Sequence, residues 1–338
     1  MTSLPSLTSR HPQVPADDLL AGFVPPPHFA DATFDSYRPD PDHPGQAQAR
    51  EHARSLAERL QDPPRRRWWT RTTPAGPALY LDGGFGVGKT HLLAAVAHAV
   101  PEAAFGTFVE YTHLVGALGF GVTVRRLSRR PAVLIDEFEL DDPGDTVLMS
   151  RLLRELNDAG VALVATSNTL PESLGEGRFA AEDFLREIQA LSDRFEVVRV
   201  DGPDYRHRGA PHPEGGLPDV EVRDGASAGG GTVDTFEDLL HHLRTVHPSR
   251  YGALVQDVPV VGITAVAPLI DQADALRLVV LVDRLYDRDV PVLLGGVGTT
   301  GLFGDAMLRG GYRKKYLRAL SRLTALAAAG RDQLPAST

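Results

Sequence analysis

Cysteine is absent from the 338-residue chain. This absence excludes disulfide frameworks, thiolate zinc sites and a cysteine nucleophile, and it fits a reducing compartment. No apolar run approaches the roughly 18 residues that a membrane-spanning helix needs. The N-terminal sequence lacks the apolar core of a signal peptide, and its acidic residues do not suit a transit peptide. We therefore expect a cytoplasmic protein with at most peripheral contact to the inner face of the cell membrane.

Positive charge is also in short supply, because 35 Lys and Arg residues face 44 Asp and Glu residues and the net charge is −9. This balance argues against a mainly nucleic-acid-binding role, since phosphate binding needs a basic surface. A local basic patch can coexist with an acidic total. The stretch Arg125–Arg130 holds four arginines and could contact nucleic acid or another subunit, although we favour a solvated entrance to the strand that follows.

Aromatic residues make up only 7% of the chain, and both tryptophans lie in the stretch Arg65–Trp69. Tryptophan beside arginine suits a membrane surface or a partner interface. The simpler interpretation, which we favour, is a solvated turn whose tryptophans pack on the domain.

Apolar runs alternate with helical patterns along most of the chain, which indicates a parallel sheet with helices on both faces. The length predicts two domains. We expect strands at 78–81, 105–110, 132–135, 161–166, 196–200, 260–266 and 290–294. Helices are expected at 46–60, 90–100, 111–118, 145–159, 181–192, 235–246, 271–286 and 313–328. The predicted organisation is a loosely ordered N-terminal arm (1–45), an α/β core (46–206), a Gly/Pro-rich linker or insertion (207–231) and a smaller C-terminal α/β unit (232–330).

The segment Gly83–Thr90 has the pattern G-x-x-x-x-G-K-T between an expected strand and an expected helix. Glycines allow a sharp turn that presents successive backbone N–H groups to an anion, and the helix N-terminus adds positive potential. Lys89 would reach the β- and γ-phosphates of ATP, and the Thr90 hydroxyl would bind Mg²⁺. The expected nucleotide-binding residues are Gly83, Gly84, Phe85, Gly86, Val87, Gly88, Lys89, Thr90 and His91.

Two acids follow the buried strand Ala132–Ile135. In a P-loop fold the first of them, Asp136, holds Mg²⁺ together with Thr90, and Glu137 is well placed to activate the attacking water. Their simpler interpretation is a helix N-cap and a surface acid. The acid pair favours hydrolysis over transfer to a small metabolite, because it supplies a carboxylate that activates water.

Two further residues complete the expected site. Asn168 follows the strand Val161–Thr166 and could orient water or sense the γ-phosphate, or it could merely end the strand. Arg194 precedes the fifth strand and could complete the site of a neighbouring subunit as an arginine finger. Its simpler interpretation is a surface arginine paired with Asp193 or Glu196. Arg178 and Arg186 compete with it for the finger role.

These elements, in this order, resemble the AAA+ branch of the P-loop ATPases. The phrases DEFELDDPGD, ATSNTLPESL, DGPDYR and LVDRLYDR narrow the resemblance to the ZapE family of bacterial cell-division ATPases, which is related to mitochondrial Afg-type ATPases. The resemblance runs from about residue 30 to residue 325. The chain departs from the family pattern at Thr169–Pro171, where a proline pair commonly follows the SN, and after Ser321–Leu323, where the usual acidic residue is missing.

The resemblance implies an AAA+ P-loop fold and an ATPase that assembles in a nucleotide-dependent way, contacts the membrane peripherally and acts on the FtsZ ring or on membrane-associated protein clients. Two alternatives share the same core. A nucleic-acid-associated ATPase such as a helicase loader would need a basic face, and a small-molecule kinase would need an acceptor site. Tyr37 and Phe34 precede the first strand and are candidates for packing near the adenine.

Overall fold

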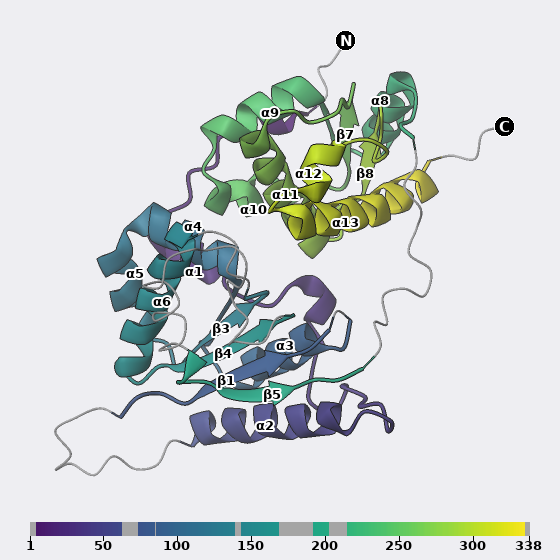
Figure 1. The fold of residues 1–338 in the computed structure, drawn as a ribbon. Helices are drawn as coiled ribbons and strands as arrows, with labels where there is room; N and C mark the ends of the chain where they lie inside the picture. Colours follow the sequence, from purple (N-terminus) through teal and green to yellow (C-terminus); the bar gives the residue numbers. More distant parts are fainter. Residues whose placement is uncertain are drawn as a thin grey trace. The chain divides into compact units, whose positions relative to one another are not determined.

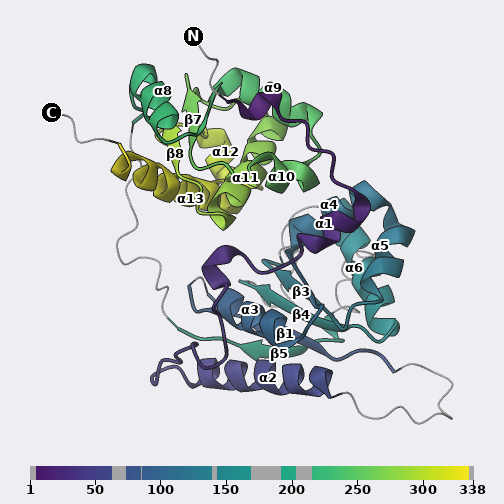
Figure 2. The ribbon, with the colours of Figure 1, turned by 180° about the vertical axis from the view of Figure 1, so that it is seen from behind.

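The computed structural model describes residues 5–62, 74–84, 86–138, 143–168, 192–202 and 215–334. The chain divides into two compact units, drawn in Figures 1 and 2. The central unit comprises Ala16–Arg208, and the terminal unit comprises Met1–Pro15 together with Gly209–Thr338. Each unit is a parallel sheet covered by helices, so the predicted fold class is confirmed. Within the described ranges, no helix combines the length and the apolar character that crossing a membrane requires.

Five parallel strands form the sheet of the central unit, in the order β2-β3-β4-β1-β5. Their bounds are β1 (Ala78–Asp82), β2 (Ala104–Thr107), β3 (Ala132–Asp136), β4 (Ala162–Ser167) and β5 (Glu196–Arg199). β4 lies between β1, which the glycine-rich loop follows, and β3, which the two acids follow. Its residue Ala165 pairs with both Tyr80 and Ile135. The carboxyl ends of β1, β3 and β4 therefore meet at one edge of the sheet.

Helices cover both faces of this sheet. α2 (Pro44–Gln61) and α3 (Lys89–Ala99) pack on one face, and α4 (Phe108–Leu118), α5 (Phe120–Leu127) and α6 (Pro143–Asp158) pack on the other, where α1 (Ala16–Ala21) joins them. Side chains of a strand alternate between faces. Accordingly, Leu79 and Leu81 belong to the core under α2 and α3, whereas Tyr80 belongs to the opposite core.

The expected strand 105–110 ends early. It stops at Thr107 because Thr107 and Glu110 form a capping box: the Glu110 N–H donates to Thr107 Oγ1 at 3.2 Å, and the Thr107 N–H donates to Glu110 Oε2 at 2.7 Å. This exchange satisfies backbone donors at the start of α4. Most of the expected helix 181–192 and the whole of Arg65–Trp69 lie outside the described residues.

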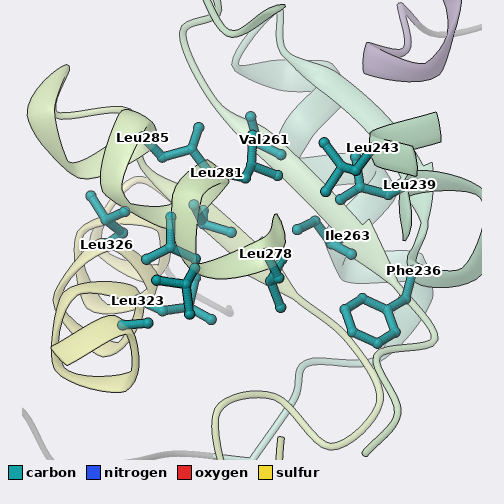
Figure 3. Close-up of a cluster of buried hydrophobic side chains, with 14 of the residues drawn as sticks. Phe236, Leu239, Leu243, Val261, Ile263, Leu278, Leu281, Leu285, Leu323 and Leu326 are labelled. Atoms are coloured by element: carbon teal, nitrogen blue, oxygen red, sulfur yellow. The ribbon is translucent and has the colours of Figure 1, made fainter. Parts of the chain in front are cut away.

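The terminal unit has a three-stranded parallel sheet in the order β6-β7-β8. The strands are β6 (Thr232–Thr235), β7 (Val261–Thr264) and β8 (Val292–Leu294). Figure 3 shows the main core, where leucines of α9 (Phe236–Thr245), α11 (Gln272–Asp287) and α13 (Arg313–Asp332) converge on Val261 and Ile263 of β7. The short helices α10 (Tyr251–Leu254) and α12 (Asp305–Arg309) also belong to this unit.

Residues 219–228, which lie within the predicted linker or insertion 207–231, form helix α8 (Asp219–Ala228). Val222 and Ala226 lie one turn apart on it and are fully buried in a small core with Val260 and Leu293. Small side chains allow close approach, since a Cβ at Gly262 of β7 would lie 3.0 Å from the Ala226 Cβ.

The N-terminal residues also differ from a loosely ordered arm. Leu7 is fully buried in the main core of the terminal unit. The buried Asp234 carboxylate accepts hydrogen bonds from the Leu7 N–H at 2.8 Å, from the Thr8 hydroxyl at 2.8 Å and from the Ser6 hydroxyl. The Arg10 guanidinium donates to the carbonyls of Leu254 and Gln256. These residues are therefore an integral part of the terminal unit, although their contacts lie more than two hundred residues away in sequence.

Candidate nucleotide-binding site

The glycine-rich loop lies between β1 and α3, at the carboxyl edge of the central sheet. Gly88 has a φ of +89° and is the N-cap of α3. Gly83 lies against Val200, the residue that follows β5, because a Cβ on Gly83 would sit 2.2 Å from the Val200 carbonyl oxygen. Both positions require glycine, one for its backbone conformation and one for space. Phe85 lies outside the described residues. The loop ends at the N-terminus of α3, and helix N-termini attract anions.

Lys89 occupies the first turn of α3 and is 8% exposed. Its Nζ donates hydrogen bonds to the carbonyl oxygens of Gly83 and Gly84, each at 2.6 Å, and to Asn168 Oδ1 at 2.9 Å. The contact to Asn168 follows from the strand order, since β4 and β1 are neighbours and Asn168 comes directly after β4. The structure thus brings together two residues that the sequence suggested separately.

Thr90 and Asp136 also lie side by side. The Thr90 hydroxyl is 3.1 Å from both carboxylate oxygens of Asp136, which is 7% exposed. A second hydroxyl, that of Thr166 at the end of β4, donates to Asp136 Oδ1 at 2.5 Å. Our sequence interpretation missed Thr166. A signal was present, because Thr166 precedes Ser167 and Asn168 at the polar end of an otherwise apolar strand.

Glu137 follows β3 in a left-handed backbone conformation, with a φ of +53°. Its N–H donates to Thr166 Oγ1 at 3.1 Å, so one threonine contacts both neighbouring acids. A positive φ is uncommon for residues other than glycine, and such strained positions concentrate at functional sites. Glu137 is partly exposed.

Residues ahead of the first strand pack beneath the loop. The Tyr37 hydroxyl donates to the Val87 carbonyl at 2.9 Å, and a Cβ at Gly88 would lie 2.5 Å from the Tyr37 ring. His91 Nε2 is 3.0 Å from Ser36 Oγ. Phe34 instead lies near α2, where the Arg54 guanidinium is 5.6 Å from its ring centroid. Tyr37 therefore contacts the glycine-rich loop directly.

Arg194 is not part of this cluster within one chain. It precedes β5, at the amino edge of the parallel sheet, whereas the glycine-rich loop is at the carboxyl edge. Its guanidinium donates to Asp158 Oδ1 at 2.6 Å and to Asn157 Oδ1 at 3.0 Å. These contacts differ from the pairing with Asp193 or Glu196 that we considered. The competing Arg178 and Arg186 lie outside the described residues.

Oxygen atoms dominate the ligands that this edge offers to a metal ion. Among the described residues, no three His, Asp or Glu side chains form a group that could hold a metal. A metal here would rely on the Asp136 carboxylate and the Thr90 hydroxyl, with its other ligands supplied by phosphate and water. Mg²⁺ is commonly bound in this way, by one or two carboxylates plus substrate phosphates.

Comparisons with known proteins agree with this description. The model of the AFG1-like ATPase family matches residues 13–215 and 217–331. The cell division protein ZapE of Escherichia coli K12 is 34% identical over 152 residues, which are 41% of this chain and 40% of ZapE. Lactation elevated protein 1 homolog B of Danio rerio is 34% identical over 77 residues, 22% of this chain and 15% of that protein.

Among solved structures, AMPPCP-bound DnaA from Aquifex aeolicus aligns with a TM-score of 0.38 and 13% identity, covering 59% of this chain and 55% of DnaA. The aligned part of the chain spans about two-fifths of the length of ZapE. The family match, by contrast, extends over nearly all of the chain and includes both units. The chain belongs to the AFG1-like ATPase family.

Proposed function

We propose that the protein binds ATP at the carboxyl edge of the central sheet and hydrolyses it. One observation carries the proposal: the Lys89 ammonium, the Asn168 amide and the Thr90–Asp136 pair gather where three strand ends meet. Family membership supports the same activity. Each group has the chemistry that one part of a hydrated triphosphate needs.

Phosphate recognition falls to the loop and to Lys89. The Lys89 Nζ contacts the carbonyls of Gly83 and Gly84, so the ammonium already lies over the turn in which backbone amides would hold phosphate. ATP would draw this ammonium onto its β- and γ-phosphate oxygens. Asn168 would sense the γ-phosphate through its hydrogen bond with Lys89, and it would help to orient the attacking water.

Thr90 and Asp136 would hold Mg²⁺, which neutralises charge on the phosphate oxygens when bound. Thr166 fixes the Asp136 carboxylate through its hydroxyl and also accepts the Glu137 N–H. Glu137 would take a proton from the attacking water as general base. General-base catalysis contributes typically about 10²–10⁴-fold in rate.

Arg194 would act in the site of a second copy of the chain. Within one chain it lies at the opposite edge of the sheet from Lys89, so it can stabilise transition-state charge only across an interface. Asp158 and Asn157 would hold the guanidinium in position through their contacts with it. We propose that the protein assembles in a nucleotide-dependent way for this reason.

The biological role that we propose follows the relatives. ZapE is described as a cell division protein, so we propose that this ATPase acts on a protein client at the division site, with the FtsZ ring as the first candidate. We place it in the cytoplasm, at most peripherally at the inner face of the cell membrane.

ATP binding can be tested by thermal unfolding. ATP with Mg²⁺ at about 100 times its Kd should stabilise the protein by about 2.7 kcal/mol. Lys89→Ala should lose this stabilisation and ATP turnover, whereas Lys315→Ala, which changes a lysine of the terminal unit, should keep both. Equal stabilisation of Lys89→Ala and the unchanged protein would contradict the proposal.

The role of Arg194 in a neighbouring site can be tested by mixing variants. Arg194→Ala and Lys89→Ala should each show low ATP turnover alone. Mixed, they should regain activity, because an intact glycine-rich loop from one copy then meets an intact arginine from another. A mixture that turns over ATP at only the sum of the two separate rates would contradict this role.

A further inference from the structure

A cavity of the central unit lies at the amino ends of β2 and β3, the edge opposite the nucleotide site. Ala104 begins β2 and Arg130 lies two residues before β3, and both line this cavity. Its volume is about 430 Å³, within the range of ligand-binding pockets. Most of the lining is apolar, and its residues include Leu20, Phe23, Val24, Ala97, Ala104 and Arg130.

The walls of this cavity are held in place by hydrogen bonds. The Phe23 carbonyl accepts the Phe105 N–H at 2.9 Å, which fixes the segment after α1 along the edge strand β2. The Phe23 ring fills the space above Gly106, where a Cβ would meet it at 2.8 Å. On the other side, His98 Nε2 is 2.8 Å from the Phe29 carbonyl. The cavity is therefore preformed.

The rim of this cavity exposes apolar surface. Val24 lines the cavity and is 61% exposed, although valine is usually buried. The aromatic ring in the lining, that of Phe23, is only 8% exposed. Single-stranded nucleic acids bind largely through bases stacked on accessible aromatic rings. The cavity suits an aliphatic or aromatic side chain better than a nucleobase.

Three more arginines precede Arg130 of the cavity lining in the sequence, within residues 125–130. α5 ends at Leu127, but the N–H groups of Arg129 and Arg130 donate to the carbonyls of Arg126 and Leu127, so the helical turn goes on. Arg125 and Arg129 are exposed, and no ion pair joins either to an acid of the described chain. The Arg130 guanidinium donates to the Glu102 carbonyl at 3.4 Å. Arg130 and the acidic Glu102 both line the cavity, and Arg125, Arg126 and Arg129 add positive charge in the segment that leads to it, in a protein whose net charge is −9.

We propose that this cavity and the arginines of residues 125–130 form a docking site for an acidic protein segment that inserts one bulky apolar side chain. The arginines would steer the segment by charge complementarity, and the cavity would supply specificity. The site is separate from the nucleotide site, so binding here does not depend on ATP hydrolysis.

Four fluorescent dodecapeptides would test the docking site with the full-length protein in the absence of nucleotide. They carry the same flanking Asp and Glu residues and differ only in a central Leu, Phe, Trp or Ser. Fluorescence anisotropy should show saturable binding of at least one apolar peptide, with the Ser peptide weaker by about tenfold or more. Hydrogen–deuterium exchange should show added protection in residues 20–30 and 127–131.

Two surface variants locate the site. Val24→Ser removes apolar surface at the rim, and Arg129→Glu reverses one exposed charge; each should weaken binding by about tenfold. Arg223→Glu makes the same charge change on an exposed residue of α8, in the other unit, and should bind as tightly as the unchanged protein. All three changes are at exposed positions and should leave the melting temperature unchanged.

Three results would overturn the proposal. The first is no saturable binding by any of the apolar peptides, and the second is equal binding of the Ser peptide. The third is stronger binding of a single-stranded oligonucleotide, or of phosphatidylglycerol vesicles, with no effect of Val24→Ser. That last result would mean that the arginines bind phosphate groups and that the cavity takes no part in binding.

Discussion

The two units are both parallel sheets covered by helices, yet a buried carboxylate in one and a half-buried carboxylate in the other serve different purposes. In the central unit Asp136 ends β3, and the hydroxyls of Thr90 and Thr166 contact its oxygens. In the terminal unit Asp283 of α11 contacts the guanidinium groups of Arg318 and Arg322 at 3.0 and 2.6 Å. One carboxylate stands at a strand end among hydroxyls, and the other joins two helices through ion pairs.

The partners decide what each carboxylate can do. Burial alone would raise the pKa of Asp283, but the charges of Arg318 and Arg322 outweigh it and lower the pKa. A carboxylate between two guanidinium groups has a structural role, because its ion pairs hold α11 against α13. Hydroxyl groups are neutral and can themselves become metal ligands, so the Asp136 cluster can receive a cation. The same chemical group is structural in one unit and available for chemistry in the other.

The strongest test of this comparison is the same substitution in both units. Asp136→Asn should lower ATP turnover by about a hundredfold or more, because the proposed metal ligand is lost, with little change in unfolding free energy. Asp283→Asn should cost about 3–5 kcal/mol of stability, because it leaves two arginines without their shared partner. Turnover assays and hydrogen–deuterium exchange of α11 and α13 measure the two effects. The comparison fails if Asp136→Asn unfolds the central unit while Asp283→Asn keeps full stability.

A slightly smaller effect is expected for the N-terminal residues. Leu7→Ala should destabilise the terminal unit by about 2–4 kcal/mol, because Leu7 is fully buried in its core. Exchange protection should fall in β6 and α9 and remain in the central sheet. Leu317→Ala is the control, since that leucine is 43% exposed and surface changes are usually within about 0.5 kcal/mol. Loss of protection confined to the central unit would contradict the assignment of Leu7 to the core of the terminal unit.

Acid should affect the terminal unit through its ion pairs. The hydrogen bond from Arg244 lowers the pKa of Asp274, and the pKa of Asp283 is also lowered. A depressed pKa in the folded state stabilises the protein above the unfolded pKa, and this stabilisation is lost as the pH falls through the folded value. Stability should therefore decline below about pH 4. Asp274→Asn should flatten this decline in a pH series of unfolding measurements; an unchanged pH dependence would contradict the assignment.

The smallest effects are expected at helix caps, which occur in both units. Thr107 and Thr235 accept the N–H of the third residue of α4 and of α9, each at 3.2 Å. Replacing either threonine by alanine should cost about 1 kcal/mol, as measured for other N-caps. Thr107→Ala should cost more, because it also breaks a capping box. If denaturant unfolding shows that Thr107→Ala loses no more unfolding free energy than Thr235→Ala, the capping box adds nothing to stability.

Much of the central unit could be predicted from sequence because its signals are local. A glycine turn between a strand and a helix, and acids after a buried strand, specify both the elements and their chemistry. The contact of Lys89 with Asn168 also follows once the strand order is known. Thr166 was missed because threonine is common in strands, and its contacts with Asp136 and Glu137 depend on the neighbouring strand.

In the terminal unit the predicted strands and helices after residue 234 are found close to their expected positions, but the N-terminal segment and α8 were missed. Nothing near Leu7 in the sequence indicates that Asp234, more than two hundred residues later, binds the same segment. α8 was taken for part of a linker or insertion because residues 207–231 are rich in Gly and Pro, although Val222 and Ala226 of α8 are buried in a core. The roles of Glu137 and Arg194 stay predictions, since they depend on water and on a neighbouring copy.

The measurement that tests the central claim most directly compares ATP binding and phosphate release in Glu137→Gln. The change keeps the size of the side chain and removes the carboxylate that would accept a proton from water. We predict that Glu137→Gln binds ATP with nearly unchanged affinity and releases phosphate about 10²–10⁴-fold more slowly. Phosphate release at the unchanged protein's rate would contradict the role of Glu137 as the general base for hydrolysis at this edge of the central sheet.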